Sequence, residues 1–66
     1  MSCEDLNNQM QKLARRWNEN NADAHSYQGA VEYNGLRDEI RNRCGINSYI
    51  EWESGNGYVV KNELLD

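Results

Sequence analysis

The sequence contains no phenylalanine, and its 66 residues include no long apolar run. The missing run excludes a membrane-spanning helix, and no basic segment followed by an apolar one comes after Met1 to suggest a secretory leader. Only 38% of the residues are hydrophobic, so any core must be thin. A chain this short buries only about 60% of the surface that its unfolded form exposes. We therefore expect one small cytoplasmic domain, with dimerisation or partner binding as a source of further stability.

The residue patterns that carry common chemistry are also missing. There is no phosphate-binding glycine loop, nucleotide fingerprint or metal-spaced cluster. His25 has Ser26 and Asp23 nearby in sequence, but neighbours on one helix do not converge as a catalytic triad does, so we interpret His25 as a surface or capping residue. Glu51 and Glu53 would lie about 7 Å apart on one strand, which favours a solvated acidic face over paired catalytic carboxylates. We expect no enzymatic activity, no cofactor and no metal.

Charge is unevenly distributed along the chain. Eleven acidic residues against seven basic ones give a net charge of -4. This balance argues against a partner held mainly through the nucleic-acid backbone, and no membrane partner is expected. Residues 1–46 carry seven acids and six bases, whereas residues 47–66 carry four acids and one base. The C-terminal third is therefore the acidic end.

A first amphipathic helix is predicted over about residues 3–19. Ser2 is suited to cap its N-terminus, while Glu4 and Asp5 complement the positive end of the helix dipole. Apolar residues recur at spacings of three and four, as a single buried stripe requires. The residues of this stripe are Cys3, Leu6, Met10, Leu13 and Trp17. The asparagine-rich run at 18–21 ends the helix.

A second helix is predicted from about residue 23 to residue 44. Asp23 is its expected N-cap, and Gly45 stands where a left-handed C-terminal residue is favoured. The positions that share its apolar side are Gly29, Tyr33, Leu36, Ile40 and Cys44. Gly29 on this side would let the first helix approach closely. Asn34 followed by Gly35 is also a turn signal, so the sequence leaves open whether this helix is continuous past Gly35.

From residue 48 the apolar pattern changes to period two, which predicts a β-hairpin over about residues 48–62. Gly55, Asn56 and Gly57 are expected to form a three-residue turn, with Gly57 in the left-handed conformation. This loop length keeps the large apolar groups on one face. The strand pairs that it predicts are Trp52 with Val60, Ser54 with Tyr58, and Glu51 with Lys61.

The hairpin is expected to pack on the helical pair through the face that carries Ile50 and Trp52, because an isolated two-stranded hairpin is marginal in water. Leu64 and Leu65 are expected to fold back onto the helices. The predicted architecture is a single α+β domain over residues 1–66. In it a two-helix antiparallel hairpin is followed by a C-terminal β-hairpin, in the order α-α-β-β.

Cys3 and Cys44 are predicted to be neighbours, because the start of the first helix lies near the end of the second in an antiparallel pair. Reduced thiols acting as small hydrophobic groups are favoured for a cytoplasmic chain. An intramolecular disulfide that staples the thin core is the alternative, and an intermolecular bridge is a third option. Two thiols alone do not complete a zinc site.

Every aromatic side chain carries a polar group; the set is Trp17, Tyr27, Tyr33, Tyr49, Trp52 and Tyr58. Such side chains are suited to surfaces where part of the ring is buried in the protein itself and the rest is buried when a partner binds. We expect Trp17, Tyr33 and Trp52 to lie in the core. Tyr27 and Tyr49 fall off the apolar faces and are the predicted exposed contacts.

The favoured function is a small acidic protein-binding module that inhibits or modulates a larger partner. Accessory proteins of phages and mobile elements, such as anti-CRISPR-type inhibitors, are of this kind. An acidic hairpin could occupy a basic nucleic-acid groove of its target. The predicted partner-binding residues are Tyr27, Tyr49, Glu51, Glu53 and Glu63, with Asp66 adding negative charge.

The alternative function is a homodimeric αα-hairpin protein, either structural or nucleic-acid-binding. Its two helices would pair with a second copy, and Arg15, Arg37 and Arg41 would face the ligand. Acidic residues are interleaved with these arginines, which is also typical of ordinary solvated helix surfaces. The sequence leaves the partner and the oligomeric state open.

Overall fold

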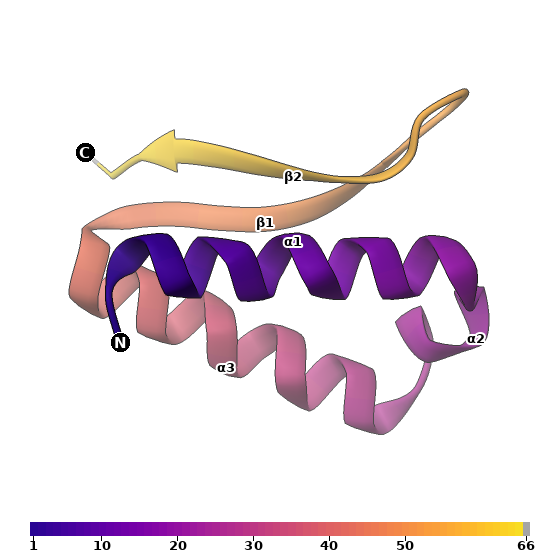
Figure 1. Ribbon diagram of the computed structural model, residues 1–66, viewed down its shortest axis with the longest axis horizontal. Coiled ribbons are helices and arrows are strands. Elements are labelled where there is room, and N and C mark those ends of the chain that lie inside the picture. Colours follow the sequence, from indigo (N-terminus) through magenta and orange to yellow (C-terminus); the bar gives the residue numbers. More distant parts are fainter. Residues whose placement is uncertain (66) are drawn as a thin grey trace.

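The computed structural model describes residues 1–65, which form two layers (Figure 1). One layer holds helix α1 (Cys3–Glu19) and helix α3 (Tyr27–Cys44), joined through the single-turn helix α2 (Asn21–Ala24). The other layer is an antiparallel hairpin of strands β1 (Ile46–Glu53) and β2 (Gly57–Leu64). Strand β2 packs on α1 and strand β1 packs on α3. The predicted α+β class, with helices first and the hairpin last, is confirmed.

Helix α1 forms as its sequence pattern predicts. The Ser2 hydroxyl accepts a hydrogen bond from the backbone N–H of Asp5 at 3.1 Å, and the Asp5 carboxylate accepts one from the Ser2 N–H at 3.3 Å. This capping box satisfies N–H groups at the helix start that have no partner within the helix. The buried residues of the helix are Leu6, Met10, Leu13, Ala14 and Trp17. Cys3, at the end of the stripe, is exposed.

The second long helix starts later than predicted, because Ser26 and not Asp23 is its N-cap. The Ser26 hydroxyl accepts from the N–H of Gly29 at 2.9 Å and donates to the carbonyl of Asp23 at 2.8 Å. This turn divides the predicted helix into α2 and α3. A Cβ atom at Gly29 would collide with the Asp23 carbonyl oxygen, so Gly29 makes room for the turn and not for α1.

Helix α3 is continuous through Gly35 and ends at the left-handed Gly45. The predicted apolar side is confirmed, since Ile40 is buried and Tyr33 and Leu36 are half-buried against the core. Leu6, Met10 and Ile40 form the centre of that core. The side chains packed around this centre are Tyr33, Leu36, Cys44, Ile46, Ile50 and Val60.

The hairpin has the predicted three-residue loop, but the loop comprises Ser54–Asn56 and lies one residue earlier than expected. The observed pairs are Ile50 with Val60, Trp52 with Tyr58, and Tyr49 with Lys61, so the predicted pairs Trp52–Val60, Ser54–Tyr58 and Glu51–Lys61 are wrong. Gly57 adopts the predicted left-handed conformation, with φ 77°. It does so as the first residue of β2, where the Asn18 side chain packs too closely to admit a Cβ atom.

Three apolar side chains that we expected on the core lie outside it. Trp52 is 64% exposed, because it precedes the hairpin tip, which rises away from the helices (Figure 1). Leu64 is 87% exposed, since its strand partner Ile46 takes the place against the core. Leu65 is 40% exposed and is not among the residues of the core. No helix within residues 1–65 is long and apolar enough to cross a membrane.

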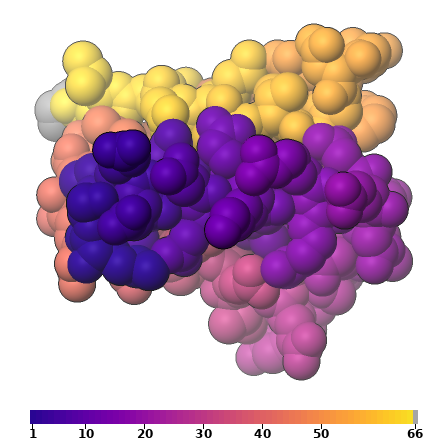
Figure 2. All heavy atoms as spheres, viewed as in Figure 1, coloured from indigo at the N-terminus to yellow at the C-terminus, as the bar shows by residue number. Residues whose placement is uncertain are grey.

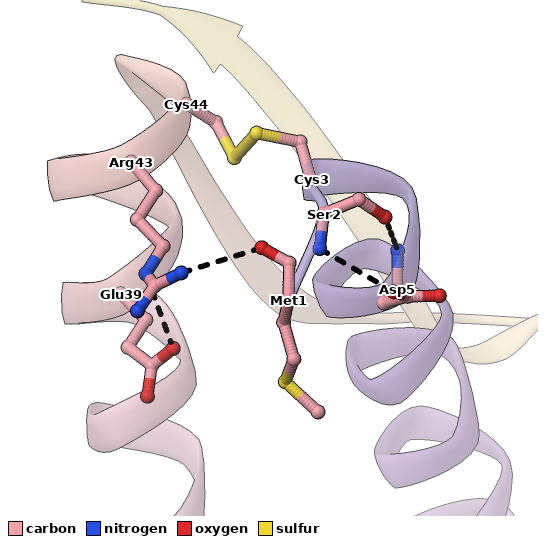
Figure 3. The surroundings of a disulfide bond; sticks show 7 residues. All are labelled: Met1, Ser2, Cys3, Asp5, Glu39, Arg43 and Cys44. Carbon is pink, nitrogen blue, oxygen red and sulfur yellow. Dashed lines mark hydrogen bonds and ion pairs between the residues drawn. A yellow bond between two sulfur atoms is a disulfide. The ribbon is translucent and has the colours of Figure 1, made fainter.

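Cys3 and Cys44 form a disulfide that closes the open end of the helical pair (Figure 3). Their Cα atoms are 5.9 Å apart, within the range that a disulfide requires. The antiparallel arrangement of α1 and α3 brings the two residues to this distance, as the sequence predicts, and the structure joins them within one chain. Beside the bond, Arg43 donates to the carbonyl of Met1 at 3.3 Å, and Glu39 lies 3.8 Å from Arg43.

Removing the disulfide is expected to lower the free energy of unfolding by about 2–4 kcal/mol, because the bond restricts the unfolded chain over a long loop. Urea unfolding of the wild type with and without dithiothreitol measures this loss. The control is the Cys3→Ser/Cys44→Ser variant, whose midpoint should match that of the reduced wild type and not respond to dithiothreitol. Equal midpoints for oxidised and reduced wild type would contradict the expectation.

Candidate functional site

The outer face of the hairpin, which points away from the helices, carries most of the predicted contact residues. We call it the acidic face; its charged and phenolic residues are Tyr49, Glu51, Glu53, Lys61 and Glu63. Alternation along the strands places all of them opposite the core-facing Ile50 and Val60. Three carboxylates and one ammonium group make this face negative.

Two contacts across the strands order the acidic face. The Tyr49 hydroxyl donates to Glu63 Oε1 at 2.8 Å, and Lys61 Nζ lies 2.7 Å from Glu53 Oε2. Glu51 is exposed, and no cation of residues 1–65 forms an ion pair with it. Glu51 is therefore the carboxylate of this face that is most available to a partner.

These contacts also set the proton affinities of the groups involved. The hydrogen bond to Glu63 raises the pKa of Tyr49 above its usual 10.0, and partial desolvation adds to the effect. Lys61 lowers the pKa of Glu53 below 4.5, with help from the Asn56 amide, and Glu53 in turn raises the pKa of Lys61. Near neutral pH the Glu53 carboxylate therefore stays ionised and the Tyr49 phenol stays protonated.

Tyr27 does not belong to this surface. It is 83% exposed, as predicted, but it is the first residue of α3, whose start lies on the side of the helical pair away from the hairpin (Figure 1). There it lines a shallow depression of about 310 Å³ with Gln28, Val31 and Glu32. The structure thus brings four of the five predicted contact residues together and leaves Tyr27 apart. Asp66 lies outside the described residues.

A second candidate surface, which the sequence did not predict, lies beside the hairpin tip. The rings of Trp17 and Tyr58 meet edge to face with centroids 5.6 Å apart, and those of Tyr58 and Trp52 meet at 5.2 Å. Trp17 is buried, Tyr58 is half-buried and Trp52 is 64% exposed. The three rings therefore run as a continuous stack from the core to solvent.

This stack borders a groove of about 420 Å³, which we call the aromatic groove. Its lining residues are Trp17, Asn18, Asn21, His25, Trp52, Gly57 and Tyr58. The Asn18 amide accepts from the N–H of Tyr58 at 2.7 Å and donates to its carbonyl at 3.0 Å. The Tyr58 hydroxyl donates to Asn21 Oδ1 at 2.6 Å. Tyr58 is fixed at both backbone and side chain, so the ring that supports Trp52 is preorganised.

The groups around His25 are occupied by structural contacts. Ser26 uses its hydroxyl to cap α3, and Asp23 forms an ion pair with Arg16 at 2.9 Å. His25 itself is exposed at the rim of the aromatic groove. These three side chains therefore do not converge as a nucleophile, a base and an orienting acid. Residues 1–65 also contain no group of three side chains that could hold a metal ion.

Of the three arginines proposed for nucleic-acid binding, Arg15 and Arg41 are exposed and form no ion pair within residues 1–65, whereas Arg37 is engaged. Arg37 donates to the Asn47 side chain at 2.7 Å, and its guanidinium lies 5.7 Å from the centre of the Tyr33 ring. Arg16 is engaged by two carboxylates, Asp23 and Glu32, and the Glu32 contact is the larger cause of its raised pKa. Arg41 borders a polar groove of about 220 Å³ that Arg37 also lines.

Comparison with known protein families, with curated protein sequences and with solved structures found no match. The chemistry of the two surfaces is therefore the basis for any proposal about function.

Asn18→Ala is expected to lower the free energy of unfolding by about 1–2 kcal/mol, because the N–H and carbonyl of Tyr58 lose their partners. Urea unfolding measures the change. Asn8→Ala, at an exposed position of the same helix, is the matched control and should stay within about 0.5 kcal/mol of the wild type. Equal stabilities of the two variants would show that the Asn18 contact contributes nothing.

Glu63→Gln is expected to lower the pKa of Tyr49 toward 10.0, because the carboxylate that favours the protonated phenol is removed. In the wild type the raised pKa means that the folded state binds this proton more tightly than the unfolded chain. Its contribution to stability is therefore present below the ordinary pKa and is lost as pH rises through the raised one. NMR titration of the Tyr49 ring measures the shift. Glu4→Gln is the control, and an equal titration in all three proteins would contradict the assignment.

Proposed function

We propose that this chain is a small protein-binding module that modulates a larger partner and docks through its hairpin, with Trp52 as the anchor. The observation that carries the proposal is the state of Trp52, which is 64% exposed yet held edge to face against Tyr58. Tryptophan and tyrosine are enriched among the residues that dominate binding energy at interfaces. A ring that is already ordered loses little conformational entropy when a partner covers it.

The charge beside Trp52 favours a basic partner surface. Glu51 and Glu53 are the sequence neighbours of Trp52 and lie on the acidic face, on the opposite side of strand β1. Complementary charge raises association rates and suppresses wrong partners more than it raises affinity. A basic groove that normally holds a nucleic-acid backbone is one surface of this kind. Inhibition of a nucleic-acid-binding protein, as by accessory proteins of phages and mobile elements, is therefore the specific form that we propose.

The second candidate, a homodimeric helical protein that binds nucleic acid, has less support. Of its three proposed arginines, Arg37 is engaged with Asn47, which leaves Arg15 on α1 and Arg41 on α3 without an ion pair within residues 1–65. Phosphate contacts need arginines and lysines whose charge is free to replace the counterions of the nucleic acid. Protein binding through the hairpin remains the function that the geometry favours.

The place of action can be tested through the disulfide. The sequence favours the cytoplasm, where structural disulfides are rare, whereas the Cys3–Cys44 bond suits an oxidising compartment. Alkylation of the chain in intact cells, followed by mass spectrometry, measures the thiol state where the protein works. Two alkylated cysteines would support cytoplasmic action, and an unmodified pair would support an oxidising location.

Trp52→Ala is expected to weaken partner binding by about thirtyfold or more, which corresponds to about 2 kcal/mol for an anchor residue. Partners captured from cells that produce the protein would be identified by crosslinking, and their affinities measured by calorimetry. Glu51→Lys should slow association at low salt and have less effect at high salt.

Tyr27→Ala is the matched control, because Tyr27 is an exposed aromatic residue remote from the hairpin. It should bind as the wild type does. If Tyr27→Ala lost binding while Trp52→Ala kept it, the docking surface would be the start of α3 and the proposal for the hairpin would be wrong.

A further inference from the structure

Along the two outer edges of the hairpin, some backbone N–H and C=O groups have hydrogen-bond partners on the helices and others have none in the described part of the chain. In an antiparallel pair, the backbone N–H and C=O of alternate residues point toward the partner strand or away from it. The N–H of Ile50 donates to the Tyr33 hydroxyl at 3.1 Å, and both backbone groups of Tyr58 bond to Asn18. These contacts show which residues point outward.

On β2, the alternation that points Tyr58 outward also points Val60, Asn62 and Leu64 outward. Within residues 1–65 the sheet has only two strands, and no side chain bonds to the backbone of these three residues. In Figure 2 the C-terminal half of β2 lies along the margin of the molecule above α1. The stretch from Val60 to Leu64 is therefore an open strand edge, which is a template for another strand.

We propose that this edge pairs antiparallel with β2 of a second copy of the chain, around a two-fold axis at Asn62. In this register Asn62 faces Asn62 of the second copy, and Val60 faces Leu64 of the second copy. All of these residues point their backbone groups outward, so each facing pair exchanges two hydrogen bonds. The result is a four-stranded sheet.

Charge selects this register over its neighbours. With the axis at Asn62, Lys61 lies opposite Glu63 of the second copy, and the contact occurs twice by symmetry. An axis at Lys61 would oppose two lysines, and an axis at Glu63 would oppose two glutamates. A two-fold axis at Val60 or Lys61 would also require hydrogen bonds from the backbone N–H and C=O of Tyr58 to the second copy. Asn18 already uses both of these groups.

The apolar side chains agree with the same register. Leu64 is 87% exposed in the single chain, and the proposed pairing places it against Val60 of the second copy. This contact is on the helix-facing side of the sheet, whereas the Lys61–Glu63 contacts are on the acidic face. The dimer would therefore extend the acidic face into one surface across both copies.

Sedimentation equilibrium over a concentration series tests the proposal on the wild-type chain with its disulfide intact. The edge is short, so we expect a weak dimer with a dissociation constant in the micromolar range or above. Lys61→Glu and Glu63→Lys should each weaken dimerisation by about tenfold or more, because each opposes like charges twice. Asp38→Lys, at an exposed position of α3, is the control and should dimerise as the wild type does.

Mixing the two charge variants is the decisive measurement. Lys61→Glu carries two acids and Glu63→Lys carries two bases at the edge, so an equimolar mixture should form a heterodimer while each variant alone stays monomeric. A wild type that stays monomeric at millimolar concentration would overturn the proposal. A mixture that dimerises no better than either variant alone would also overturn it, by excluding this register.

Discussion

The carboxamide of Asn18 pairs with both backbone groups of Tyr58, and this contact connects the helical layer to the hairpin. It brings the Asn18 side chain against the position that a Cβ atom of Gly57, the first residue of β2, would occupy. It holds the Tyr58 ring between Trp17 and Trp52. It also occupies the strand edge at Tyr58, so that the open part of β2 starts at Val60. One amide thus contributes to the start of β2, to the aromatic groove and to the limit of the free edge.

Local sequence patterns were sufficient to predict α1, the hairpin and the sides that face the core, but not the division of the second helix into α2 and α3. Periodicity and the Ser2 cap define α1, and period-two alternation separates the acidic face from Ile50 and Val60. The exact loop position could not be predicted, because shifting the loop by one residue changes each strand partner by two positions and leaves every side chain on the same face. The contact that fits the observed register comes from Asn18, 40 positions before Tyr58. A pattern read along the chain does not contain it.

Contacts between residues far apart in the sequence also explain what was missed at the candidate sites. Tyr49 and Glu63 could be assigned to one face from alternation, and the structure joins them by a hydrogen bond. Trp52 was expected in the core because it lies on the same side of strand β1 as Ile50. Alternation shows which side of the sheet a residue faces, but not whether the helices extend far enough to cover it. Asp23 and Ser26 are both suitable N-caps. They are distinguished by the tight turn in which the Asp23 carbonyl oxygen lies against Gly29, a contact that the sequence pattern does not reveal.

The disulfide gives the chain an unusual covalent topology. Cys3 and Cys44 close the two long helices and the turn between them into a ring, and the hairpin follows this ring as a tail. A single proteolytic cut between the two cysteines leaves one covalent molecule, whereas a cut in the hairpin releases a peptide. The helical pair is thus protected against separation by a backbone break. The hairpin, which carries the proposed contacts, is attached covalently only through Gly45, and otherwise by hydrogen bonds and packing on the helices.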